Sequence, residues 1–232
     1  MAISEFGLNT GQNTSGATLA IGSLSTASGN CIVALVVERN ATGATGTVTD
    51  TPGNTYVLSA SYPLDGSTAN GVVQLFTAKS NLTLSSGTIT YTKAVSGTKV
   101  AMSLFYLTGC DTTAPVRTSA TTKADYTAST SPVATISGIQ TTDFVLEFCG
   151  GDGTGGSFLQ DSFFTGINSQ VSTGNLSSDA RINAGYLSPS AATSVTVGPS
   201  FGSNATGTMM LAAFITPGTA GGGSGSFFPF LG

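Results

Sequence analysis

The sequence predicts an all-β protein, an antiparallel and jelly-roll-like β-sandwich built from two sequence-related halves with little helix. Apolar residues occur in short runs that alternate with polar residues or are rich in β-branched side chains, as in strands. Turn-forming pairs such as Asp-Gly, Asn-Gly and Ser-Gly separate the runs at spacings of roughly 8–12 residues, which is typical of sandwiches. No stretch has the 3.6-residue apolar period of an amphipathic helix.

The first half begins with the alternating run TLAIGSL at 18–24 and the continuous apolar run CIVALVVE at 31–38. A continuous apolar run of this length indicates a strand that is buried on both faces. A similar run, VAMSLFYL at 100–107, closes the half. Turns that contain glycine or proline separate the shorter strands that we expect between these runs, at 46–50, 55–61, 71–78 and 87–92.

The second half follows a polar link near 111–129 and is organised in the same way. A short alternating strand is expected at 133–137, and the apolar run FVLEFC at 144–149 follows it. The glycine-rich segment 150–156 then interrupts the strands. The remaining strands are expected at 157–164, 182–187, 194–197 and 208–215.

The two halves echo each other in sequence. Residues 18–38 resemble 131–148, and residues 73–109 resemble 182–218. Such duplication predicts either one sandwich or two small tandem sandwiches. We favour one sandwich, because each half has few long apolar strands of its own. The expected organisation is an N-terminal arm at 1–17, a sandwich at 18–217 with halves of about 18–110 and 131–217, and a glycine-rich tail at 218–232.

The composition argues against an enzyme. The chain contains no histidine and no tryptophan, and only 8% of its residues are charged. The absence of histidine excludes Ser-His and Cys-His nucleophile pairs and histidine-ligated zinc. A net charge of −4 provides no basic surface for nucleic acid. We therefore expect no catalytic residue, no cofactor, no metal and no nucleic-acid partner.

Acidic residues are the remaining candidates for chemistry. Glu38 and Glu147 lie in related strands of the two halves, an arrangement that would suit the carboxylate pair of a glycosidase. The alternative, which we favour, is that each points outward and takes no part in catalysis. An oxygen-ligated calcium site at Asp50, Asn54, Asp65 or Asp152 is the other candidate. Their spacing fits no EF-hand, so we expect turn-forming side chains instead.

Three cysteines, Cys31, Cys110 and Cys149, are too few for a disulfide framework. Two of them lie within apolar runs, which favours free buried thiols over a Cys31–Cys149 bridge.

The start of the sequence has neither the basic region nor the apolar region of a signal peptide. No window approaches the roughly 18 apolar residues of a membrane-spanning helix. A Gly-, Ser- and Thr-rich chain of this kind is unusual for an exported protein and natural for a virion component that is made in the host cytoplasm. We therefore expect a virion location, with an extracellular surface as the alternative.

A resemblance supports the virion interpretation. The segments VTDTPGNTY at 48–56, LFTAKSN at 75–81, GTITYT at 87–92, FYLTGCDTTAPV at 105–116 and AAFITP at 212–217 occur in this order. They resemble a β-sandwich module that recurs in phage virion and bacterial surface proteins, including capsid decoration and fibre-like proteins. The resemblance spans roughly residues 18–217. It implies a virion or surface role and carries no catalytic residue.

The tail combines a Gly/Ser linker with an apolar end. It either folds back on its own sandwich or docks on a neighbouring subunit, and we favour docking because the linker is longer than a fold-back needs. The residues expected at this assembly interface are Phe227, Phe228, Pro229, Phe230 and Leu231.

The sequence thus predicts a non-enzymatic structural protein of a phage virion, specifically a capsid decoration or cement protein. We expect it to form a homo-oligomer, with a trimer favoured, and to bind the major capsid protein or another virion protein. The alternatives are a glycan-binding adhesin or a tail or head fibre module that binds a host surface glycan, and a subunit of an extracellular filament. The residues expected to bind a glycan are Tyr56, Tyr62, Asp65 and Tyr126.

Overall fold

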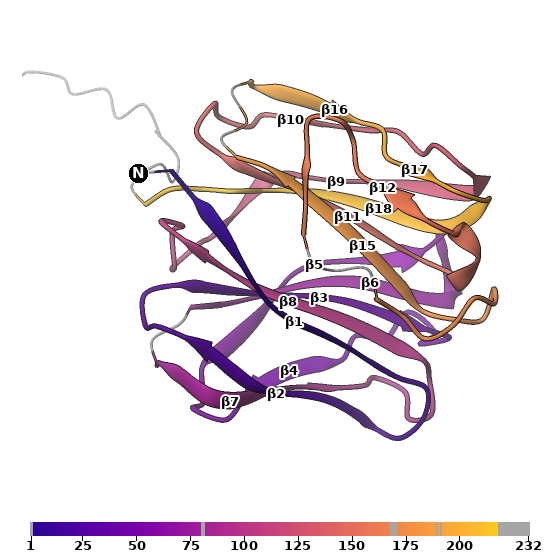
Figure 1. Cartoon of the computed structure of the whole chain (residues 1–232), viewed down its shortest axis with the longest axis horizontal. Coiled ribbons are helices and arrows are strands. Elements are labelled where there is room, and N and C mark those ends of the chain that lie inside the picture. The colour runs from indigo at the N-terminus through magenta and orange to yellow at the C-terminus, as the bar shows by residue number, and fades with distance from the viewer. Residues whose placement is uncertain (1, 80–81, 168–170, 189, 191, 218–232) are drawn as a thin grey trace, which may run out of the picture.

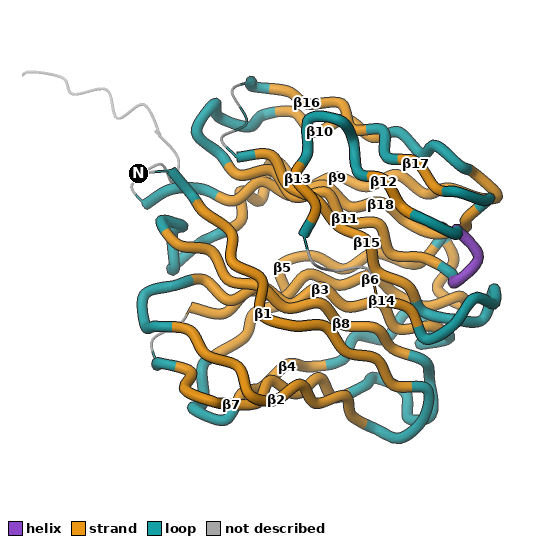
Figure 2. The backbone as a smooth tube through the Cα atoms, viewed as in Figure 1, coloured by secondary structure: helices purple, strands orange, loops and turns teal. Residues whose placement is uncertain are grey.

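The structure is a computed structural model, and it describes residues 2–79, 82–167, 171–188, 190 and 192–217. The chain is folded almost entirely into antiparallel strands, and the one helical element described is the 3-10 turn η1 (Gly153–Gly155) (Figure 2). The strands form four layers that stack face to face, two from each half of the chain (Figure 1). The predicted all-β sandwich is therefore confirmed.

Within its described residues, the first half contains eight strands in two sheets. An inner sheet has the order β1-β8-β3-β6-β5, and an outer sheet has the order β2-β7-β4. Pairing of the first strand with the eighth, the second with the seventh and the third with the sixth is the rolled pairing of a jelly roll. The bounds are β1 (Ser4–Asn13), β2 (Thr18–Thr26), β3 (Cys31–Arg39), β4 (Thr47–Asp50), β5 (Thr55–Leu64), β6 (Ser67–Lys79), β7 (Leu84–Thr92) and β8 (Val100–Thr108).

The second half repeats this topology. Its inner sheet has the order β13-β15-β11-β18-β9, which matches β5-β6-β3-β8-β1, and its outer layer pairs β10 with β16 as β2 pairs with β7. Further short strands, β14 and the pair β12 and β17, complete the half. The bounds are β9 (Val116–Ser129), β10 (Ala134–Ser137), β11 (Phe144–Gly151), β12 (Phe158–Leu159), β13 (Thr165–Gly166), β14 (Val171–Ser172), β15 (Arg181–Leu187), β16 (Ser194–Val197), β17 (Ser200–Phe201) and β18 (Ala205–Phe214).

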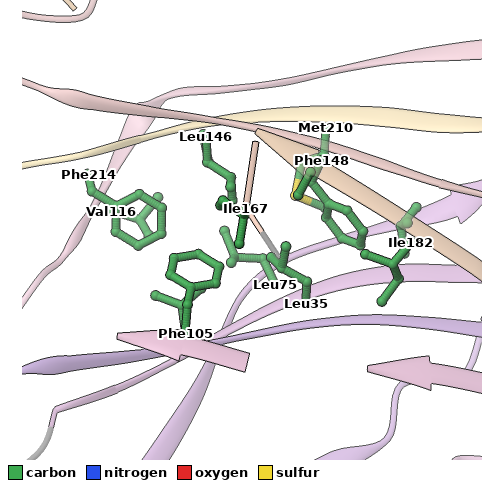
Figure 3. Packing of buried hydrophobic residues seen from close by; sticks show 14 of the residues in the cluster. Leu35, Leu75, Phe105, Val116, Leu146, Phe148, Ile167, Ile182, Met210 and Phe214 are labelled. Carbon is green, nitrogen blue, oxygen red and sulfur yellow. The ribbon is translucent and has the colours of Figure 1, made fainter. Parts of the chain in front are cut away.

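Three apolar cores lie between the four layers. In β3, Ile32, Ala34 and Val36 face the outer sheet of the first half, while Val33 and Leu35 face the second half. The inner sheets of the two halves enclose the central core, which includes residues such as Leu35 and Phe148 (Figure 3). The third core lies between β11 and β18 and the outer strands of the second half. Because β3 is covered on both faces, its apolar run is continuous rather than alternating.

Two long strands, β1 and β9, were not predicted, and neither were the two-residue strands β13, β14 and β17. Residues 4–13, expected within an arm, form β1, which pairs with β8 at the edge of the inner sheet. Residues 116–129, expected to be mostly a polar link, form β9, which pairs with β18. Both are edge strands with polar side chains, so they lack the apolar pattern that identified the others. Conversely, the strand expected at 157–164 is only the short β12.

Among the residues that the structure describes, no helix has the length and apolar character needed to cross a bilayer.

Candidate assembly surface

A groove of about 440 Å³ lies between β5 and the linker that joins the two halves. The β5 wall includes Val57 and Leu58, whose side chains are 59% and 38% exposed. The opposite wall is the linker, with Ala114 and Pro115 followed by Val116. Val116 also belongs to the central core. The groove is therefore an open, largely apolar site that borders the central core.

The linker wall is held by hydrogen bonds. The Asp111 carboxylate accepts bonds from the backbone N–H groups of Thr113 and Ala114, at 2.7 and 2.9 Å, which fixes a tight turn. The Asp111 N–H donates to the Ile215 carbonyl at 2.8 Å, and the Ile215 N–H donates to the Pro115 carbonyl at 2.9 Å. The chain that follows β18 is thus tied to the groove wall two residues before the described part ends at Pro217.

The other wall, β5, is an edge strand. Within the described residues it pairs with β6 only, so its second edge is not part of a sheet. Its register shifts between Leu58 and Ala60, and the Ser59 hydroxyl lies 2.8 Å from that of Thr77 on β6. A sheet edge without a partner strand, lying beside an apolar groove, can bind an extended peptide as an additional strand.

The residues predicted to form the assembly interface, Phe227, Phe228, Pro229, Phe230 and Leu231, lie outside the described residues. The structure does place the residues just before the tail, because Ile215 is hydrogen-bonded to the groove wall. The groove itself was missed by sequence reasoning. Its only sequence signal was the adjacent apolar pair Val57 and Leu58, which interrupts the alternation of an edge strand.

The prediction that Glu38 points outward is wrong. Its side chain is fully buried and faces the outer sheet of the first half. The carboxylate accepts hydrogen bonds from the hydroxyls of Tyr91 (2.6 Å) and Thr98 (2.7 Å), and from the backbone N–H groups of Ala94 and Val95 (3.2 Å each). Burial beside this carboxylate raises the pKa of Tyr91. Glu38 is therefore a structural acceptor that ties β3 to β7 and to the loop after it.

The prediction that Glu147 points outward to solvent is also wrong, because its side chain is buried. It is fully buried on the outer face of β11, opposite Gly185 of β15. Neither carboxyl oxygen has a hydrogen bond of normal geometry among the described residues. Burial raises the pKa of Glu147 to about 8, and the nearby Asp161 backbone offsets only part of this effect. Glu38 and Glu147 lie on opposite sides of the central core, so they form no carboxylate pair.

The calcium candidates form turns, as predicted. Asp50 accepts hydrogen bonds from the backbone N–H groups of Gly53 and Asn54 and from the Asn54 side chain. Asp65 accepts from the Asn70 side chain, and Asp152 accepts from the Thr154 backbone. Within the described ranges, no three His, Cys, Asp or Glu residues gather as a metal site.

All three cysteines are free and buried, as predicted for Cys31 and Cys149. Cys31 belongs to the central core and Cys149 to the core of the second half, so the two thiols face different layers. Cys110 lies in the central core near the groove, with its sulfur 4.0 Å from the Pro115 carbonyl oxygen.

The residues expected to bind a glycan do not form one platform. Tyr126 is buried, with its ring stacked on Phe201. The Tyr56 hydroxyl donates to Asp50. Tyr62 lies under the Lys123 ammonium, which is 5.9 Å from the ring centroid.

Comparisons with known proteins do not place the chain in a family. No protein-family model matches it, and neither the curated proteins nor the solved structures contain a match.

Proposed function

We propose that this chain is a non-enzymatic structural protein of a phage virion, a capsid decoration protein that acts by assembly. Its subunits would associate as homo-oligomers, with a trimer favoured, and would bind the major capsid protein or another virion protein. The observation that carries the proposal is the apolar groove beside the point where the tail leaves the sandwich. An apolar acceptor and an apolar segment on the same chain are the two parts that self-assembly requires.

The interior supports a structural role. Four layers share three cores, and the two buried glutamates are enclosed by them rather than open to a substrate. A stacked, rigid body with few charges suits a protein that covers or cements a shell.

The alternative proposals, a fibre or adhesin module and a filament subunit, differ from this one in what the chain binds. A fibre or adhesin module would bind a host glycan, and a filament subunit would exchange strands or tails in an open chain. The unpaired edge of β5 is compatible with strand exchange. The dispersed positions of Tyr56, Tyr62 and Tyr126 favour assembly over glycan binding.

Deletion of residues 218–232 tests the proposal. Since the three cores are each built from side chains within the described residues, the truncated chain should keep its circular dichroism spectrum and melting temperature. It should no longer join its neighbours or a shell, as measured by sedimentation and by binding to purified particles. A truncated chain that assembles normally, or one that unfolds, would refute the role of the tail.

A further inference from the structure

We propose that the groove between β5 and the linker binds residues 227–231 of a second copy of this chain. The inference rests on the proposed function and adds to it the acceptor surface for the apolar segment. This groove, the socket, is defined by Val57, Leu58, Thr77, Ala114, Pro115 and Val116. The segment FFPFL at 227–231 is called the plug.

The chemistry of the two parts is complementary. The socket is lined by aliphatic side chains and by Thr and Ser hydroxyls, and none of the described residues that line it is charged. The plug consists of aromatic and aliphatic residues without a charge. The socket has a volume of about 440 Å³, which is within the range of sites that enclose small apolar groups. Neither part would bring like charges together when two identical copies meet.

The backbone of the socket suits an extended peptide. Because β5 pairs only with β6 among the described residues, the plug can add to its outer edge as a further strand. Pro229 in the centre of the plug has no N–H to donate, and an edge strand tolerates this loss.

The length of residues 218–226 and the place where the described chain ends favour a plug from a second copy over a plug from the same chain. Ile215 is hydrogen-bonded to Pro115, so the tail leaves the sandwich at the wall of its own socket. Residues 218–226, GTAGGGSGS, precede the plug and can span up to about 30 Å when extended. Binding in the same chain would need little of this length and would loop out the rest. Binding to a neighbour uses the length to cross between subunits.

A plug and a socket are different surfaces, so each contact is head-to-tail. Contacts of this type either close into a ring or continue as an open filament. A closed ring of three copies is the trimer favoured for this protein, and it leaves no plug or socket unfilled.

Val57→Asp tests the socket. A carboxylate in the apolar groove should lower the association constant by at least about tenfold, measured by sedimentation velocity. Val133→Asp is the matched control, because Val133 is 60% exposed against 59% for Val57 and does not line the groove. Ala114→Arg on the exposed linker wall is a second blocking variant in case Val57→Asp lowers the melting temperature.

A mixing experiment identifies the source of the plug. The full-length Val57→Asp chain keeps its plug, and a chain that lacks 218–232 keeps its socket. Each should be monomeric alone, whereas an equimolar mixture should form a pair with one plug in one socket. If neither blocking variant weakens association, the socket is refuted.

Three further outcomes show whether this inference fails alone or together with the proposed function. If the blocking variants sediment differently from the wild-type chain but the mixture forms no pair, the plug binds its own chain. The inference is then overturned. If full-length and truncated chains form the same oligomer, another surface assembles the protein; the plug is then refuted while an assembly function remains. If the wild-type chain is monomeric under every condition, both proposals fail.

Discussion

The two buried glutamates show how identical side chains take different roles in different surroundings. Glu38 is surrounded by four donors, two hydroxyls and two backbone N–H groups. Glu147 lies on the corresponding strand of the other half but lacks hydrogen bonds of normal geometry among the described residues. The sequence predicted that both lie in strands of related position. It could not predict that both are buried, because burial depends on layers that cover each face and are distant in sequence.

Glu38→Gln should lower the free energy of unfolding at neutral pH by about 2–4 kcal/mol, because an amide can accept only part of the four bonds and turns an N–H toward the remaining donors. Chemical denaturation with urea measures this change. Glu147→Gln is the matched comparison: at pH 9 it should raise stability, since it removes a buried carboxylate that has no well-placed hydrogen-bond donor among the described residues. Equal losses in the two variants would contradict the different roles assigned to them.

The stability of the wild-type protein should fall as pH rises from about 4.5 to 8. The folded state holds the Glu147 proton up to a pKa of about 8, whereas the unfolded chain releases it near the ordinary value of 4.5. Between these values the folded state binds more protons, so deprotonation favours unfolding, by about 3–5 kcal/mol over the whole window.

Glu5, whose pKa burial also raises, contributes in the same direction, so the difference between wild type and Glu147→Gln isolates Glu147. The measurement is urea denaturation of both chains at several pH values. Parallel curves for the two chains would show that Glu147 does not titrate in this window.

At the scale of elements, the alternating and continuous apolar runs predicted most strands close to their observed bounds. Strand β3 was expected at 31–38 and spans Cys31–Arg39, and β16 was expected and found at 194–197. The edge strands β1 and β9 were missed because their polar side chains carry no apolar period. The partner layers of β3 and β11 were also beyond prediction, since a continuous apolar run indicates burial on both faces without identifying what covers them.

Gly150 on β11 lies where the two inner sheets approach each other closely. A Cβ at this position would overlap the Val73 side chain of β6 and approach that of Val37. Gly150→Ala should therefore destabilise the protein by about 1–3 kcal/mol through overpacking, as measured by thermal or urea unfolding.

Adding Val73→Ala should recover part of this loss, because it removes the Val73 Cγ1 atom, which the new methyl group overlaps most. A control substitution, Gly97→Ala, meets no atom within 4 Å, although its positive φ of 84° adds a small backbone cost. If the double variant shows the simple sum of two losses, the sheets are not in contact at this point.

At the scale of the whole molecule, two jelly-roll-like halves stack through their inner sheets and share a central core. The internal echo in the sequence predicted the repeat of elements. It did not predict the groove, which arises where the linker between the halves crosses the edge of β5. A groove made by two segments distant in sequence becomes visible only when the halves are placed together. The proposed assembly function depends on this arrangement.

Quantitative mass spectrometry of purified virions tests the central claim most directly, because a decoration protein and its alternatives differ in copy number. The proposed function predicts this chain in the particles at a copy number comparable with that of the major capsid protein. A handful of copies per particle would indicate a fibre or tail component instead. Complete absence of the chain from purified particles would contradict the account.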